Sequence, residues 1–279
     1  MPATPFRFFD VRVLRAQRLS PAMVRVTFVG DDLSAFVSGG RDQRFKLFLP
    51  HPGQDAPVLP ADLGDGWFAA WREMDPAVRA VMRTYTVRDQ RRDPDEVDVD
   101  FALHTGDHAP AGATDGPASS WARTARPGDR AALLGPVEED NGGVDFRPPP
   151  GTDWTLLTGD ETALPAIAGI LARLAPDAPA KVWIEIPSAE DAQPLPTKAA
   201  ADITWLVREG ARTSPVLDAV RAADLPPGTP YAWIAGESAA VRTLRRHLVD
   251  DRQFDRKAIK FTGYWRQGVT EDDLIAEIA

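Results

Sequence analysis

Cysteine is absent from this chain of 279 residues. Without thiols the protein has no disulfide framework, no thiolate nucleophile, no iron–sulfur cluster and no cysteine-ligated zinc. Any chemistry with iron must therefore use another cofactor or a bound chelate.

Long apolar runs are also absent: no stretch approaches the roughly 20 consecutive apolar residues that a membrane-spanning helix needs. The first residues, Met1–Phe6, lack the basic start and apolar stretch of a secretory signal. Hydrophobic residues make up 43% of the chain and charged residues 26%, which is typical of globular proteins. We expect a cytoplasmic protein, and a monomer, because nothing in the sequence marks assembly.

Positive charge is scarce. The chain has 32 basic and 41 acidic residues, a net charge of −9, which argues against general nucleic-acid binding. Arginine dominates the basic residues, together with abundant alanine and proline, as in proteins from GC-rich genomes, so a single arginine carries little information. The rare lysines are more distinctive; they are Lys46, Lys181, Lys198, Lys257 and Lys260.

The pattern of the chain changes near residue 150. Before it, short segments alternate apolar and polar residues between turn signals, which predicts an antiparallel β-barrel. The predicted strands are Phe8–Leu14, Met23–Val29, Arg44–Leu49, Tyr85–Val87 and Val97–His104. The segment Pro148–Gly151 continues neither a strand nor a helix and predicts a linker. We therefore expect two domains, residues 1–148 and 152–279.

After the linker, strand-like runs alternate with helical ones, which predicts an α/β domain with a parallel sheet. The strands are expected at Trp154–Thr158, Lys181–Ile186, Thr204–Arg208, Tyr231–Ala235 and Phe261–Trp265. The helices are expected at Ala163–Ala175, Pro215–Ala223, Ser238–Asp250 and Glu271–Ile278.

The segment Arg83–Arg88 brings a cation, an aromatic ring and a hydroxyl together. In an extended strand Arg83 and Tyr85 share one face while Thr86 points to the other. This set suits a flavin: the cation pairs with a phosphate, the ring covers the isoalloxazine and the hydroxyl hydrogen-bonds a ring nitrogen. The alternative is an ordinary amphipathic strand with solvated arginines.

Small residues fill the segment Gly116–Ala122, which predicts close approach of the backbone to a ligand. A helix beginning near Ser119 would direct free N–H groups at an anion such as a pyrophosphate. The alternative is a surface helix capped by Ser119 or Ser120.

Two later segments follow predicted strands of the second domain. Gly159–Thr162 and Ala235–Glu237 lie where open parallel sheets bind ligands, which suits a nicotinamide dinucleotide. The GxGxxG fingerprint is absent, and a helix N-cap would explain the acidic residues equally well. In Gly263–Gly268, an aromatic pair between glycines packs either against a flavin edge or in the core.

Taken in order, these motifs closely resemble the siderophore-interacting protein family. The matching segments read Arg-x-Tyr-Thr-x-Arg, Gly-Pro-Ala-Ser-x-Trp-Ala, Thr-Gly-Asp-Glu-Thr-Ala-Leu-Pro-Ala, Ala-Gly-Glu and Gly-Tyr-Trp-x-x-Gly. Members of this family are cytoplasmic flavin-dependent ferric-siderophore reductases related to the ferredoxin–NADP reductases. The resemblance covers the chain from Phe9 to Gly268.

The resemblance implies an FAD-binding, ferredoxin-reductase-type barrel followed by a nucleotide-binding α/β domain. By it, Arg83 pairs with the FAD diphosphate, Tyr85 stacks on the isoalloxazine and Thr86 reaches the N5 region. The implied cofactor-binding residues are Arg83, Thr84, Tyr85, Thr86, Arg88, Asp100, Phe101, Leu103, His104, Ala118, Ser119, Ser120, Trp121, Asp160, Thr162 and Trp265. The implied nicotinamide-binding residues are Gly159, Asp160, Glu161, Thr162, Gly236 and Glu237.

The implied activity is transfer of hydride from NADH or NADPH to FAD and one-electron reduction of siderophore-bound iron(III), which releases iron(II). No side chain is needed as a nucleophile or a metal ligand. Ferric chelates are often anionic, so we expect a local basic site on this acidic protein. Its candidates are Lys46, Lys260, Arg245 and Arg246, each of which is otherwise a solvated surface charge.

Two departures from the family pattern bear, in turn, on the shape of the cofactor's outer edge and on the access and choice of the donor. The segment Thr105–Asp115 is longer than usual, and Gly135–Asp140 is acidic where relatives carry a Gly-Pro-Arg-Gly-like turn. Reduced ferredoxin is a further possible donor.

Two other functions remain open. One is a flavin-dependent reductase whose acceptor is a protein such as ferredoxin, although the sequence shows no obvious charged docking face. The other is a non-catalytic ferric-siderophore binder, which would be colourless because it needs no flavin.

Overall fold

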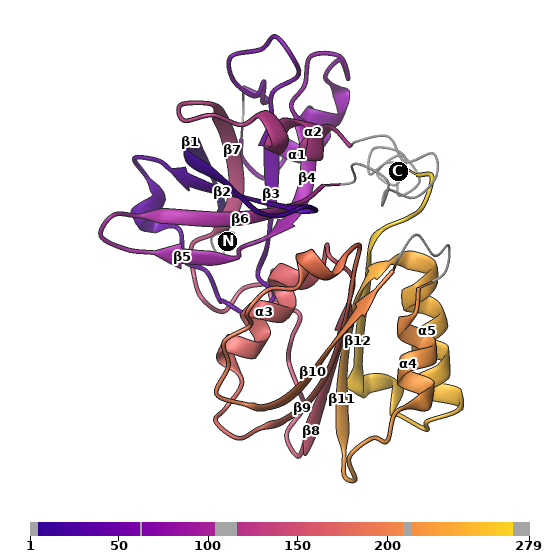
Figure 1. Cartoon of the computed structure of the whole chain (residues 1–279). Helices are drawn as coiled ribbons and strands as arrows, with labels where there is room; N and C mark the ends of the chain where they lie inside the picture. Colours follow the sequence, from indigo (N-terminus) through magenta and orange to yellow (C-terminus); the bar gives the residue numbers. More distant parts are fainter. Residues whose placement is uncertain (1–4, 62, 104–115, 209–213, 270–279) are drawn as a thin grey trace.

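The computed structural model describes residues 5–61, 63–103, 116–208 and 214–269 (Figure 1). Two sheets, one above the other in Figure 1, are built from consecutive parts of the chain. The strands of the first sheet end at Pro136 and those of the second begin at Trp154, on either side of the predicted linker.

The first sheet has seven strands in the order β4-β3-β7-β1-β2-β6-β5, and all its neighbouring strands are antiparallel. The strands are β1 Phe6–Ser20, β2 Met23–Val29, β3 Arg44–Leu49, β4 Val81–Thr86, β5 Asp89–Arg91, β6 Glu96–Ala102 and β7 Arg130–Pro136. The sheet curls until the ring of Tyr85 on β4 lies 4.5 Å from that of Phe101 on β6. This half-barrel confirms the expected antiparallel fold.

Alternation of apolar residues along these strands builds the barrel core. Phe45, Leu47 and Leu49 of β3 are buried beside Val97, Val99 and Phe101 of β6. Three short helices flank the barrel: η1 Leu33–Ala35, α1 Trp67–Glu73 and α2 Pro117–Thr124.

The second sheet has five strands in the order β10-β9-β8-β11-β12, all parallel. Its strands are β8 Trp154–Gly159, β9 Pro179–Ile186, β10 Ala200–Val207, β11 Pro230–Glu237 and β12 Ile259–Trp265. The order reverses between β8 and β11, and open parallel sheets bind ligands beyond the carboxyl ends of such strands. The predicted parallel α/β domain is confirmed.

Helices cover both faces of the second sheet (Figure 1). On one face α3 Leu164–Arg173 packs Ile167, Ile170 and Leu171 into the core. On the other face lie α4 Val216–Ala222 and α5 Ser238–Asp250. The connections also contain two single-turn 3-10 helices, η2 Ala189–Asp191 and η3 Arg256–Ala258.

The predicted bounds of Met23–Val29, Arg44–Leu49 and Ser238–Asp250 are identical to those observed. The first strand is longer than expected, because β1 pairs along its length with β7 and then with β2. The predictions for Thr105–Asp115 and the terminal helix Glu271–Ile278 fall outside the described residues.

A buried carboxylate joins the two sheets. Asp42, which is 1% exposed, accepts hydrogen bonds from the indole Nε1 of Trp233 on β11 at 2.9 Å and the backbone N–H of Phe146 at 3.0 Å. Burial raises the pKa of Asp42. Tyr231 adds a second link, since its hydroxyl accepts a hydrogen bond from the backbone N–H of Arg147 at 3.2 Å.

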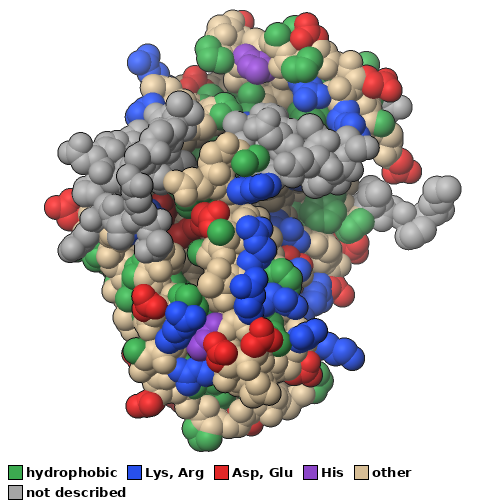
Figure 2. Space-filling model, turned by 90° about the vertical axis from the view of Figure 1, so that its right-hand side faces the viewer, with side chains coloured by type: hydrophobic (Ala, Val, Ile, Leu, Met, Phe, Trp, Pro, Cys, Tyr) green, Lys and Arg blue, Asp and Glu red, His purple; other side chains and the backbone are tan. Residues whose placement is uncertain are grey.

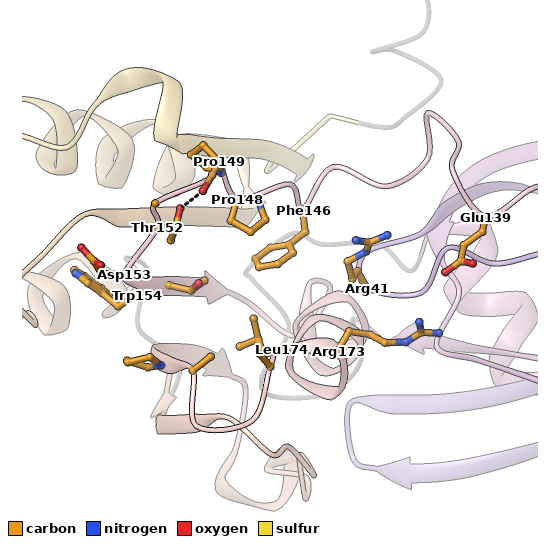
Figure 3. A pocket seen from close by; sticks show the side chains of 15 residues that line it. Arg41, Glu139, Phe146, Pro148, Pro149, Thr152, Asp153, Trp154, Arg173 and Leu174 are labelled. Atoms are coloured by element: carbon orange, nitrogen blue, oxygen red, sulfur yellow. Dashed lines mark hydrogen bonds between the residues drawn. The ribbon is translucent and has the colours of Figure 1, made fainter.

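A cavity of about 490 Å³ lies at the amino ends of β8 and β9, on the opposite edge of the sheet from the segments Gly159–Thr162 and Ala235–Glu237 (Figure 3). Arg41 and Arg173 lie at one end of it, and Phe146 and Leu174 line its middle. Linker residues form another wall, where the hydroxyl of Thr152 donates to the carbonyl of Pro149.

Candidate functional site

Strands β3 and β4 display the predicted flavin motif. Arg83 and Tyr85 pair in register with Leu47 and Phe45, and these four residues share the face that lines the barrel core. Arg83 is 8% exposed and donates a hydrogen bond to the backbone carbonyl of Met82 at 2.7 Å. Tyr85 is only half-buried, so its ring is partly accessible at the barrel rim.

The opposite face of β4 carries Thr84 and Thr86. Thr84 is exposed and accepts a hydrogen bond from Lys46 Nζ at 2.8 Å. Thr86 is buried next to the hydroxyl of Tyr264 on β12, and burial raises the pKa of that tyrosine. The first strand motif and the last aromatic motif, far apart in the chain, therefore meet.

The predicted cofactor residues on β6 hold the barrel together. Asp100 is buried and accepts hydrogen bonds from Arg25 at 2.6 and 2.8 Å, and its carboxylate lies 3.6 Å from Arg88 Nε. Phe101 and Leu103 are buried in the core. His104 lies outside the described residues.

Helix α2 begins at Pro117, earlier than expected, and Gly116 is its N-cap. Neither Ser119 nor Ser120 caps it, because no side chain makes a capping hydrogen bond. Ser119 is 5% exposed, and its hydroxyl has no hydrogen-bond partner among the described residues. Ala118 is buried as well, and Trp121 stacks on Phe28 with ring centroids 6.1 Å apart.

This arrangement fits a flavin dinucleotide. A buried hydroxyl without a partner costs free energy, about 1–3 kcal/mol, that a bound acceptor would recover. A Cβ added at Gly116 would meet no atom of the described residues within 4 Å. The residues present therefore suit a diphosphate at this helix start.

Asp160 organises the carboxyl edge of the second sheet. Its Oδ2 accepts hydrogen bonds from Trp265 Nε1 at 2.7 Å and the backbone N–H of Glu237 at 2.9 Å. Its Oδ1 accepts from both the hydroxyl and the backbone N–H of Thr162. Asp160 thus ties the ends of β8, β11 and β12 and fixes Trp265.

Two glycines permit this close packing. A Cβ at Gly236, which has φ +136°, would lie 2.6 Å from Asp160 Oδ2. A Cβ at Gly159 would lie 2.4 Å from that of Ala163 and 2.9 Å from the carbonyl oxygen of Ala235. Both positions need the bare backbone.

The acidic residues of the predicted nicotinamide set have internal partners. Glu237 is the N-cap of α5 and accepts from the N–H groups of Ala239 at 2.6 Å and Ala240 at 2.9 Å. The cap interpretation was thus correct for Glu237. It was wrong for Asp160 and Glu161, because Ala163 is the N-cap of α3 and no side chain caps that helix.

Glu161 belongs to a buried ionic cluster at the ends of β8, β9 and β10. Arg208 lies between two carboxylates, with NH2 2.7 Å from Glu161 and NH1 2.8 Å from Glu185. Glu185 also accepts a hydrogen bond from the hydroxyl of Ser214. Burial, and then the charge of Asp160, raise the pKa of Glu161 to about 7. Burial also raises the pKa of Glu185.

The predicted basic residues fall into two groups. Lys260 Nζ and Arg44 NH2 share the carboxylate of Asp145, at 2.9 and 2.7 Å. Arg44 and Lys46 occupy alternate positions of β3, on the same face. Lys46 and Lys260 therefore border one region between the two domains.

Arg245 and Arg246 lie on α5. The Arg245 guanidinium is 4.5 Å from the ring centre of Phe261, which follows Lys260 on β12 and so points to the opposite face. Figure 2 shows basic side chains gathered over α5 and the end of β12. The exposed members are Arg242, Arg246, Arg256, Lys257 and Arg266.

Sequence patterns did not identify Arg208, Glu185, Asp145 or Asp42. The one available signal was position, because Arg208 was expected to end a strand and charged residues at such ends face the ligand edge. No spacing rule links it to its two glutamates.

Comparisons with known proteins agree with the motifs. A model described as siderophore-interacting FAD-binding domain matches residues 12–140, and one described as siderophore-interacting protein matches residues 152–268. No described helix is long and apolar enough to cross a membrane.

Among similar proteins, the ferric vibriobactin reductase ViuB of Vibrio cholerae is 32% identical, over 93% of this chain and 89% of the relative. An NADPH-dependent ferric-chelate reductase of Escherichia coli is 30% identical, over 93% of each chain. The crystal structure of a siderophore utilization protein from T. fusca is similar with a TM-score of 0.80, 32% identity and 95% coverage of both chains.

Proposed function

The chain belongs to the siderophore-interacting protein family, and from this premise we propose that it is a cytoplasmic FAD-dependent NAD(P)H:ferric-siderophore oxidoreductase. In this proposal residues 1–148 bind FAD and residues 152–279 bind the nicotinamide donor. The E. coli relative is named NADPH-dependent, which supports a nicotinamide donor without deciding between NADPH and NADH.

One observation carries the proposal: Thr86 of the flavin motif on β4 lies next to the hydroxyl of Tyr264 in the aromatic motif on β12. Trp265, the neighbour of Tyr264, donates a hydrogen bond to Asp160 at the carboxyl edge of the second sheet, where we place the nicotinamide donor. Residues proposed for the cofactor and for the donor therefore meet at one place, as electron transfer between them requires.

The chain's own residues would hold FAD at the barrel rim. Arg83 and the start of α2 would bind its phosphates, Ser119 would donate its unused hydroxyl, and Tyr85 would cover the ring system. When bound, FAD supplies chemistry that accepts two electrons as hydride and passes them on singly. Thr86 would orient the ring edge.

The proposed substrate site lies between Lys46 on β3 and Lys260 on β12. Arg44 and Lys260 both pair with Asp145, and Lys46 lies on the same face of β3 as Arg44, so three cations gather here on a chain of net charge −9. An anionic ferric chelate would be attracted and oriented there. Because the chelate binds iron(III) through hard oxygen ligands, its reduction to iron(II) weakens binding and frees the metal.

The test is a visible spectrum of the purified, FAD-loaded protein without oxygen. We expect flavin absorbance that NADH or NADPH bleaches and that a ferric siderophore restores. The same chelate loaded with gallium(III), which is not reduced under these conditions, is the matched control and should restore nothing. Bleaching that no ferric chelate reverses would contradict the siderophore assignment while leaving the flavin assignment intact. A protein that binds no FAD would be a ferric-siderophore binder instead.

A second candidate is supported by the basic face over α5 (Figure 2). Among the exposed side chains of the described part of α5, η3 and the end of β12, the five cations named above form a docking face that the sequence did not reveal. Such a face suits an acidic protein such as a ferredoxin, as donor or acceptor. Bleaching by reduced ferredoxin, but not by NADH or NADPH, would favour it.

A further inference from the structure

The cluster of Glu161, Arg208 and Glu185 has an unbalanced charge. Two carboxylates share one guanidinium, and the two glutamates are 3% and 4% exposed. Glu185 uses both oxygens, one on Arg208 and one on Ser214. Glu161 uses only one, because its Oε2 is buried and has no hydrogen-bond partner in the described part of the chain.

An acceptor oxygen without a donor is a suitable place for a proton. With both glutamates ionised, the cluster has a net charge of −1 in a buried site, which costs free energy. A proton on Glu161 makes the cluster neutral. The other charged group facing Glu161 is Asp160, whose charge also favours the protonated form.

The cluster lies at the edge where the proposed donor binds. Glu161 is in the turn between β8 and α3, beside the point where the strand order reverses. A nucleotide bound beyond the carboxyl end of β8 would place its diphosphate near this turn. A diphosphate there would add negative charge next to Glu161.

We propose that the cluster of Glu161, Arg208 and Glu185 couples binding of the anionic nucleotide donor to uptake of one proton by Glu161. This inference rests on the nucleotide site proposed above. The proton comes from the solvent, forms an O–H bond on the Glu161 carboxylate and returns to the solvent when the nucleotide leaves. No electron moves in this step, and Arg208 and Glu185 act as positioning residues.

Thermodynamic linkage between proton binding and nucleotide binding determines whether the nucleotide affinity rises or falls with pH. The added negative charge of the nucleotide makes protonation of Glu161 more favourable, so by reciprocity protonation strengthens nucleotide binding. In the free protein the pKa of Glu161 is about 7. Above that pH, binding should weaken, by at most about tenfold per pH unit for a single coupled proton.

The experiment is isothermal titration of the FAD-loaded protein with NAD⁺ and with NADP⁺, which bind without reducing the flavin. Heats measured at about pH 7.5 in two buffers of different ionisation enthalpy give the number of protons taken up. We expect uptake of about half to three-quarters of a proton per nucleotide, because Glu161 is already about one quarter protonated at pH 7.5, and a Kd that rises severalfold from pH 6 to pH 8.5.

Two variants sharpen the test. Glu161→Gln should abolish proton uptake and flatten the dependence of Kd on pH. Glu190→Gln makes the same change on an exposed glutamate of the same domain and should behave as the unaltered protein.

The unaltered protein decides the matter even if Glu161→Gln does not fold. Nucleotide binding with heats that do not depend on the buffer would overturn the proton coupling and leave the proposed function standing. Uptake that persists in Glu161→Gln would also overturn it. If neither nucleotide binds, the donor part of the proposed function fails together with the inference.

Discussion

Replacing Asp160 tests whether one carboxylate organises the donor edge. Its two oxygens accept four hydrogen bonds, two from Thr162, one from the backbone of Glu237 and one from Trp265 Nε1. Asp160→Ala removes all four acceptor contacts. Asp160→Asn keeps one oxygen and places an amide N–H₂ group at the other position.

The hydrogen-bond geometry predicts a smaller loss in the free energy of unfolding for Asp160→Asn than for Asp160→Ala. In Asp160→Asn the oxygen can stay on Trp265 and Glu237, and the rotatable hydroxyl of Thr162 can accept from the amide, which leaves only the Thr162 N–H without a partner. We expect a loss of about 1–3 kcal/mol in the free energy of unfolding. Asp160→Ala leaves every donor unpaired and should cost about 3–5 kcal/mol.

Urea unfolding followed by far-UV circular dichroism measures both losses. Equal losses for the two variants, or changes under about 0.5 kcal/mol in both, would refute the role assigned to Asp160.

Two further predictions concern charge. Replacing Lys46 and Lys260 together with alanine should raise the KM for an anionic ferric siderophore about tenfold or more while FAD content stays normal. The matched double alanine variant at Lys181 and Lys198 should leave this KM unchanged. If the Lys46 and Lys260 double variant has the same KM as the unaltered protein, the substrate-site assignment is wrong. Arg208→Met leaves two buried glutamates without their cation, so at pH 8 the free energy of unfolding should fall by about 3–5 kcal/mol. The pKa values of Glu161 and Glu185 are higher in the folded than in the unfolded protein, so the stability that these acids contribute is retained at low pH and lost as the pH rises. Thermal melts of Arg208→Met should therefore show a smaller loss of stability at pH 5.5 than at pH 8. An equal loss at the two pH values would contradict the ionisation assigned to the two glutamates.

Local sequence signals sufficed for the elements that carry their own pattern. Strand β3 and helix α5 have the predicted bounds because their apolar periodicity and flanking turns agree. Strand β7 was not predicted, because Arg130–Pro136 is rich in alanine and contains glycine and proline, residues that disfavour strands. Its conformation depends on pairing with β1 and β3, which are distant in sequence.

The residues of the candidate site also fall into two groups, those marked by a local sequence signal and those whose partners are distant in sequence. The sequence placed Gly159 and Gly236 correctly at the carboxyl edge, since glycine turns after apolar strands are local signals. The partners of Arg208 are 47 and 23 residues away, so their meeting depends on the register of three strands. The direct cofactor roles of Arg83, Tyr85 and the other predicted contacts stay predictions.

The bond between Asp42 and Trp233 joins residues 191 positions apart and is sealed from water. Cutting the chain at the linker would leave the α/β half with Trp233 lacking its acceptor, and with Met23 and Phe146 missing from the apolar cluster that they complete. The α/β half would therefore lose stability when separated, whereas the barrel cores contain only residues that precede the linker. Truncations and domain exchanges that retain the α/β half should keep Asp42, Met23 and Phe146 with it.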